Sequence, residues 1–199
     1  MTHDDHGPHQ RGNHHNGSGV DGAATELHRQ LATAMADAAN RITTAILDDT
    51  LDRCTRDRAQ NTFTHIYTGP PDEGWPLATI AELAVALRDS DIRDLMFALP
   101  YTEYAATADA LWSRMSSVLP APYGADPATL LAYSAYVNGD DLRAGAALDV
   151  ALAADDEHRI ARNMRLAVDN HDPGARWRAL AEHARESAAE MGITITFIK

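Results

Sequence analysis

The 199-residue sequence has a single cysteine, Cys54, and therefore cannot form an intramolecular disulfide. An unpaired thiol is typical of a protein in a reducing compartment, so we expect a cytoplasmic location. Arg53 and Arg56 lie beside the thiol, but the local sequence supplies neither a histidine base nor a group to orient one. We therefore interpret Cys54 as an ordinary thiol rather than a nucleophile.

Long apolar runs are also missing from the sequence. No window holds 18 consecutive apolar residues, and the polar N-terminus has no apolar core of the signal-peptide kind. We therefore expect neither a membrane span nor secretion. Apolar residues make up 45% of the chain and charged residues 23%, which is ordinary for a globular protein, so we predict one domain over residues 23–199.

Basic residues are scarce relative to acidic ones. The chain has 17 lysines and arginines against 29 aspartates and glutamates, for a formal net charge of −12. Binding to nucleic acid relies on basic side chains that neutralise phosphates, so this balance argues against it. Three arginines nevertheless recur at every third position and predict a stripe on one helix, Arg159, Arg162 and Arg165. The stripe is either a solvated face paired with carboxylates or a surface for an anion or a partner.

Catalytic motifs are absent as well. The chain has no HExxH, no GxSxG, no glycine-rich phosphate loop and no CxxC pair, so we predict no catalytic residue and no cofactor. Residues 1–22 contain almost nothing apolar and are expected to be a disordered tail. Five histidines of that tail are the candidate ligands for zinc or nickel, although a disordered tail offers no partners to orient their rings: His3, His6, His9, His14 and His15.

What the chain does contain is helical pattern, clearest between residues 126 and 170. Asp126-Pro127 has the form of an N-cap followed by a proline at the first helical position. Asn138-Gly139 ends that helix, and Asp140 or Asp141 caps the next one. Alanines in both helices allow their axes to approach closely. The stretch therefore predicts an antiparallel hairpin, a single tetratricopeptide-like unit, which two further helices continue to about Gly192. The acceptors at the start of the first of these further helices are expected to be the three acidic residues 155–157.

The remaining segments complete a mainly α, multi-helix prediction. Residues 23–58 are expected to form one long helix, because seven apolar residues recur at a spacing of mostly three or four, namely Leu27, Leu31, Met35, Ala38, Ile42, Ile46 and Leu51. Such a helix either packs along the whole domain or pairs with its copy in a homodimer. Residues 59–76 predict a short strand, Phe63 to Tyr67, and a proline-rich connection. Residues 77–192 form the helical core, and residues 193–199 predict a terminal strand that pairs with the first strand or with a partner.

Four segments of the chain carry a family resemblance. They are DSDIRD at 89–94, LPAPYGADPATLLAYSAYVNGDD at 119–141, ALDVALAADDEHRIARNM at 147–164 and PGARW at 173–177. In their order they resemble the actinobacterial family called domain of unknown function 4192, over its C-terminal helical part, here Pro76 to about Glu186. The resemblance implies a helical fold and an actinobacterial origin. Members usually carry a longer N-terminal α/β portion where this chain has its tail and long helix, and the family brings no established activity.

The sequence is compatible with three functions. The interpretation that we adopt is a non-enzymatic domain that binds a protein partner or a second copy of itself. The second is an enzyme or small-molecule binder with a site assembled from polar aromatic residues, for which the candidates are His65, Tyr101, Tyr104, Tyr133, Tyr136, His158 and His183. The third is a nucleic-acid-associated protein of actinobacterial replication, plasmid or phage biology that uses the arginine stripe.

Overall fold

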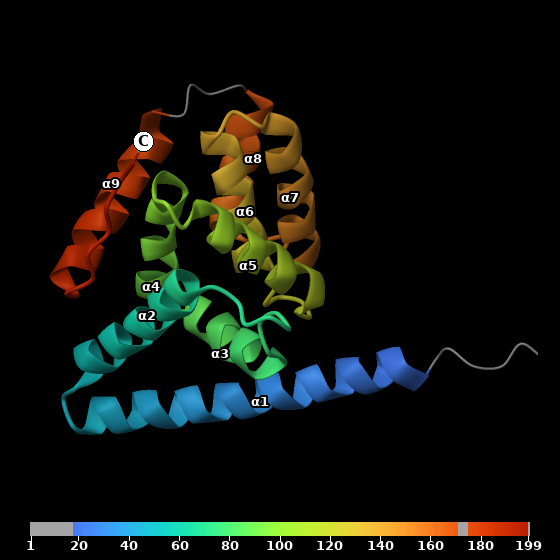
Figure 1. The fold of residues 1–199 in the computed structure, drawn as a ribbon, viewed down its shortest axis with the longest axis vertical. Helices are drawn as coiled ribbons and strands as arrows, with labels where there is room; N and C mark the ends of the chain where they lie inside the picture. The colour runs from blue at the N-terminus through green and yellow to red at the C-terminus, as the bar shows by residue number, and fades with distance from the viewer. Residues whose placement is uncertain (1–17, 171–174, 199) are drawn as a thin grey trace, which may run out of the picture.

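The computed structural model describes residues 18–170 and 175–198. The predicted mainly α class is confirmed, because the described residues form helices and no strand. The elements, shown in Figure 1, are α1 (Ser18–Leu47), α2 (Leu51–Thr68), α3 (Leu77–Leu87), α4 (Ser90–Leu95), the 3-10 helix η1 (Met96–Tyr101), α5 (Ala105–Val118), α6 (Ala125–Val137), α7 (Asp141–Ala154), α8 (Arg159–Asp169) and α9 (Ala175–Glu190).

The predicted helix over residues 23–58 is two helices, α1 and α2, that meet at a sharp corner (Figure 1). The chain turns at Asp49, whose φ of 53° lies in the left-handed region. A short polar side chain tolerates that conformation better than most, and the Thr50 N–H then donates to the Ala45 carbonyl at 2.7 Å. The pattern of apolar residues continued across the corner and concealed it. At the other end α1 begins at Ser18, so residues 18–22 are helical rather than part of the tail.

The predicted strand from Phe63 to Tyr67 is wrong, because these residues belong to α2. Phe63 and Ile66 are both buried, and their separation of three residues places them on one side of a helix. The hydroxyls of Thr62 and Thr64 donate to the carbonyls four residues earlier, which satisfies them inside the helix. Helical burial therefore outweighs the β-propensity of the threonines and aromatic residues.

The predicted terminal strand is also wrong. Within the described part of the chain, residues 193–198 form neither a helix nor a strand. Ile193 and Ile195 are buried, the Ile198 N–H donates to the Tyr101 carbonyl at 2.8 Å, and the Phe197 ring lies 5.4 Å from the Tyr101 ring. The segment is therefore an irregular C-terminal arm packed beside η1.

The core centres on α3, η1 and α6. Figure 1 shows α1 along the base of the molecule, with α3 above it and α5 to α8 grouped together. α1 packs mainly on α3, and α6 packs most extensively on α7 and then on α5. The predicted hairpin is present as α6 and α7, and its close approach follows from buried alanines on both helices, namely Ala128, Ala132, Ala135, Ala144, Ala147 and Ala151.

Two of the predicted helix ends are confirmed and two differ. Gly139 has a φ of 80° at the end of α6, and the Asp140 carboxylate accepts from the Arg143 N–H at the start of α7. The residue before α6, however, is Gly124, so Asp126 lies inside the first turn and its side chain is buried. α8 is capped by the ring of His158 rather than by the three acidic residues before it. Both differences come from one buried polar cluster.

Candidate functional site

Asp126 is the centre of the buried polar cluster. Its side chain is 1% exposed, and its carboxylate contacts groups from three other parts of the chain. Arg88 donates to Oδ2 at 3.1 Å, His158 Nε2 lies 2.9 Å from Oδ1, and Arg93 Nη1 lies 3.5 Å from Oδ1. A buried carboxylate is tolerated only when it is paired and hydrogen-bonded, and Asp126 meets both conditions. The cluster ties α3, α4 and α8 to the first turn of α6.

His158 links this cluster to the start of α8. Its Nδ1 accepts from the Ala161 backbone N–H at 3.2 Å, so Nδ1 carries the lone pair and Nε2 carries the proton. The Nε2–H then donates to Asp126 at 2.9 Å. The carboxylate thereby selects the tautomer that caps the helix. This arrangement has a structural role, since the carboxylate and the ring at its centre are 1% and 7% exposed.

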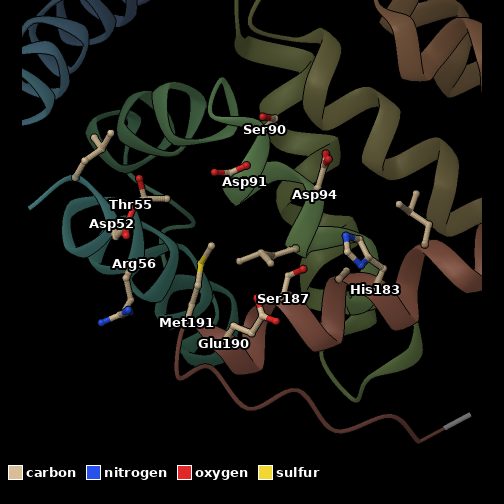
Figure 2. A pocket seen from close by; sticks show the side chains of 14 residues that line it. Asp52, Thr55, Arg56, Ser90, Asp91, Asp94, His183, Ser187, Glu190 and Met191 are labelled. Carbon is tan, nitrogen blue, oxygen red and sulfur yellow. The ribbon is translucent and has the colours of Figure 1, made fainter. Parts of the chain in front are cut away.

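A groove between α2, α4 and α9 is the more accessible candidate (Figure 2). Its volume is about 390 Å³. α2 contributes Leu51, Asp52, Thr55 and Arg56, α4 contributes Ser90, Asp91, Asp94 and Leu95, and α9 with the residue after it contributes Leu180, His183, Ala184, Ser187, Glu190 and Met191. Leu95 and Ala184 are buried beneath its floor. The groove thus combines an apolar floor with a polar rim.

The rim of the groove is predominantly acidic. Arg93 donates to Asp94 at 2.9 and 2.8 Å through two nitrogens, so that carboxylate already has a cation. Among the described residues, Asp52, Asp91 and Glu190 have no ion-pair partner within the chain. Arg56 is the one arginine or lysine along the lining, which also holds His183, and the Arg56 guanidinium points away from the groove in Figure 2. The rim therefore carries a surplus of negative charge.

The polar aromatic residues that the sequence offered as a dispersed site do not come together in one pocket. Of the seven, only His183 lines the groove. The Tyr133 hydroxyl donates to the Trp177 carbonyl at 2.7 Å, and its ring meets Phe97 edge to face. Burial raises the pKa of Tyr133, and burial together with the neighbouring Tyr104 raises the pKa of Tyr67. These phenols therefore stay protonated at neutral pH and act as packing groups.

The arginine stripe lies on α8, and two of its three members are paired. Arg162 contacts Glu157 at 2.7 Å, and Arg165 contacts Asp149 at 2.9 Å and Asp169 at 3.2 Å. Such pairs neutralise the charge that an anionic ligand would need.

The five tail histidines, His3 to His15, lie outside the described residues. Within residues 18–170 and 175–198 no three histidine, cysteine or acidic side chains are placed to hold a metal ion.

One outer side of α1 was not anticipated as a separate surface. Seven exposed, uncharged residues lie along it between Ala32 and Leu47, and we call them the α1 stripe: Ala32, Met35, Ala36, Ala39, Thr43, Ile46 and Leu47. Ile46 is 61% exposed and Leu47 is 80% exposed.

Within the part of the chain that the structure describes, no helix combines the length and apolarity needed to span a bilayer.

Comparison with known proteins gives a family and no activity. The sequence model of a family described as domain of unknown function, DUF4192, matches residues 8–175. The match therefore extends through α1, α2 and α3, well beyond the C-terminal part to which the resemblance was limited. No curated protein and no solved structure matches the chain.

Proposed function

We propose that this chain, which belongs to the DUF4192 family of domains of unknown function, is a protein-interaction domain that associates with a second copy of itself through α1. The observation that carries the proposal is the α1 stripe, where two large aliphatic side chains, Ile46 and Leu47, are 61% and 80% exposed. Exposed apolar surface at this density on a helix is typical of a contact surface.

The charges of α1 support a partner of the same kind. Between Ala32 and Leu47 the only charged residues are Asp37 and Arg41. Each residue advances a helix by about 100°, which puts both of them on a different side from the stripe. Two copies of the stripe can therefore face each other without burying an unpaired charge. A symmetric dimer requires this self-complementarity.

The small residues of the stripe define how two copies would meet. Ala32, Ala36 and Ala39 let helix axes come to about 8–10 Å. In an antiparallel pair, Ala32 of one copy lies near Leu47 of the other, and the two-fold axis passes close to Ala39. The stripe spans 15 steps of one helix, or about 22 Å, so a contact between two copies of it is small beside the roughly 1,600 Å² of a standard interface. We therefore expect a reversible dimer with a dissociation constant of about 10–100 µM.

The test is the oligomeric state as a function of concentration. Sedimentation velocity and light scattering between about 5 and 500 µM should show a shift from monomer to dimer. Ala39→Glu places two carboxylates at the axis and should leave a monomer throughout. Thr44→Glu is the matched control, because it adds the same charge at an exposed position of α1 outside the stripe. Equal loss of dimer in both variants, or a wild-type chain that stays monomeric, would overturn the proposal.

A cross-link tests the position of the axis separately. In a Cys54→Ser background, Ala39→Cys should form an intermolecular disulfide under mild oxidation, since residues at the axis approach within disulfide range. Thr44→Cys should not. Cross-linking of both variants to the same extent would show random collision rather than the proposed contact.

A further inference from the structure

The groove between α2, α4 and α9 is a second interaction surface, and we propose that it receives a short basic segment of another protein, with an aliphatic side chain flanked by lysine or arginine. This inference is independent of self-association through α1. It rests on the match between the apolar floor, the acidic rim and the orientation of α9.

The floor explains the need for an aliphatic anchor. Leu180 and Met191 are partly exposed along the groove, above the buried Leu95, and Met191 reaches toward its centre in Figure 2. Filling this floor removes apolar surface from water, which is the main favourable term in most associations. A volume of about 390 Å³ lies near the small end of the range for ligand pockets, and it suits a few side chains rather than a folded domain.

The rim explains the need for basic residues beside that anchor. Asp52, Asp91 and Glu190 surround the floor and have no ion-pair partner within the described residues, whereas Asp94 is held by Arg93. Three carboxylates facing one opening raise the local concentration of cations. An acidic or neutral segment would leave these charges without partners, so the rim selects against it.

The C-terminal end of α9 also favours a basic side chain in the groove. Ser187 and Glu190 lie in its last turn, which carries no basic residue. The last carbonyls of a helix bear a partial negative charge that favours a nearby cation. The side chains of Ser187 and Glu190 line the groove, so a cation bound there would lie beside the end of α9. A basic side chain of a partner would therefore contact both the helix end and the rim.

The probe is a fluorescein-labelled 12-residue peptide of leucines and lysines, in which the leucines recur every three or four residues and so share one side of a helix. Two variants share its length, one with every lysine replaced by glutamate and one with every leucine replaced by serine. Fluorescence anisotropy with the full chain should show binding of the leucine-lysine peptide, weaker binding of the serine-lysine peptide, and none of the glutamate peptide. Affinity should fall with added salt, because exposed charge pairs are screened.

Paired charge variants separate the groove from general attraction to an acidic protein. Asp91→Asn combined with Glu190→Gln should weaken the leucine-lysine peptide about fivefold. Asp72→Asn combined with Glu73→Gln is the control, since it removes the same charge from exposed positions in the turn that follows the C-terminal end of α2, whereas the groove lies at its N-terminal end. Ser187→Tyr should block the groove, with circular dichroism confirming that the variant folds.

Each outcome of these binding experiments either supports or overturns the groove as the binding site. Loss of affinity in the groove variants with little change in the control supports the site. Equal weakening in both charge variants, equal binding of the serine-lysine and leucine-lysine peptides, or no binding at low salt would each overturn it. Ala39→Glu, the variant designed to be monomeric, should bind the peptide as well as the wild type, so failure of the dimer and failure of the groove are distinguishable.

Discussion

Replacement of Asp126 by alanine tests the buried polar cluster most directly. The side chain is 1% exposed and contacts Arg88, Arg93 and His158. Removal of the carboxylate leaves the His158 Nε2–H without its acceptor in a site where the histidine is itself 7% exposed. It also leaves two guanidinium groups facing an apolar methyl. We therefore expect a large loss of stability for a change that removes only a few atoms.

The size of the stability loss depends on whether each former partner of Asp126 can find another group to bind. Breaking a buried ion pair on one side costs about 3–5 kcal/mol. Arg88 is 44% exposed and can turn to water, and Arg93 keeps Asp94, so both recover part of that cost. His158 has no comparable alternative for its Nε2–H. We estimate a loss of about 2–4 kcal/mol, which is a substantial part of the 5–15 kcal/mol typical of a domain.

The loss should also appear locally, at the start of α8. The cap depends on a lone pair at Nδ1, and Asp126 favours the tautomer that provides it. Without the carboxylate the proton is free to move to Nδ1, where it would face the Ala161 N–H. We therefore expect faster amide exchange in residues 159–164 than in α7. A cavity alone would not single out this turn.

Urea unfolding and thermal melts followed by circular dichroism measure the global effect. A loss of 2–4 kcal/mol corresponds to a fall in Tm of about 5–15 °C for a chain of this size. Asp149→Ala is the control, because its side chain is 73% exposed and forms a surface pair with Arg165 that should contribute about 0–1 kcal/mol. If Asp126→Ala costs no more than Asp149→Ala, or if exchange in α8 is unchanged, our account of the cluster is refuted.

Three further predictions concern packing, backbone conformation and pH. Phe63→Ala should cost about 3–5 kcal/mol by urea unfolding, because the ring is 2% exposed; a cost below about 1 kcal/mol would contradict its place in the core. Gly139→Ala should cost about 1–2 kcal/mol, because φ is 80° while the space around the added carbon is open; an unchanged Tm would argue against strain at this turn. The free energy of unfolding should be flat from neutral pH to about pH 9 and should fall above pH 10. The fall should reach up to about 1.4 kcal/mol per pH unit for the buried Tyr133 and should be smaller for Tyr67, which is partly exposed to solvent. The reason is that the pKa values of Tyr67 and Tyr133 are raised on folding, so the unfolded chain loses those protons first; Tyr133→Phe should flatten the fall, and an identical profile in that variant would refute the assignment.

The helices of the C-terminal half were predictable because their signals are local. Gly139, at positive φ, ends α6, and the side chain of the next residue, Asp140, caps α7. Neither depends on what the helix packs against. The hairpin of α6 and α7 follows for the same reason, since a short turn and small residues on both helices leave few other arrangements.

The errors came where local preference and tertiary burial pointed in different directions. Phe63 and its threonine neighbours favour a strand by composition, but burial at a spacing of three to four residues places them in α2. In α1, Leu31 and Ile46 share the same apolar pattern, yet Leu31 is 4% exposed and Ile46 is 61% exposed. The difference depends on which part of α1 the rest of the fold covers, and periodicity alone does not contain that information.

The sequence by itself determined the mainly α class, the hairpin and several helix ends, because these depend on periodicity and on backbone conformations of residues that are close in the chain. Only the tertiary structure decided the role of Asp126, which has the local form of a cap and becomes the buried partner of Arg88, Arg93 and His158. It alone also produced the groove, whose rim joins Asp52 of α2, Asp91 of α4 and Glu190 of α9. Contacts between residues so far apart in the chain depend on how the helices pack, and no local pattern records that packing.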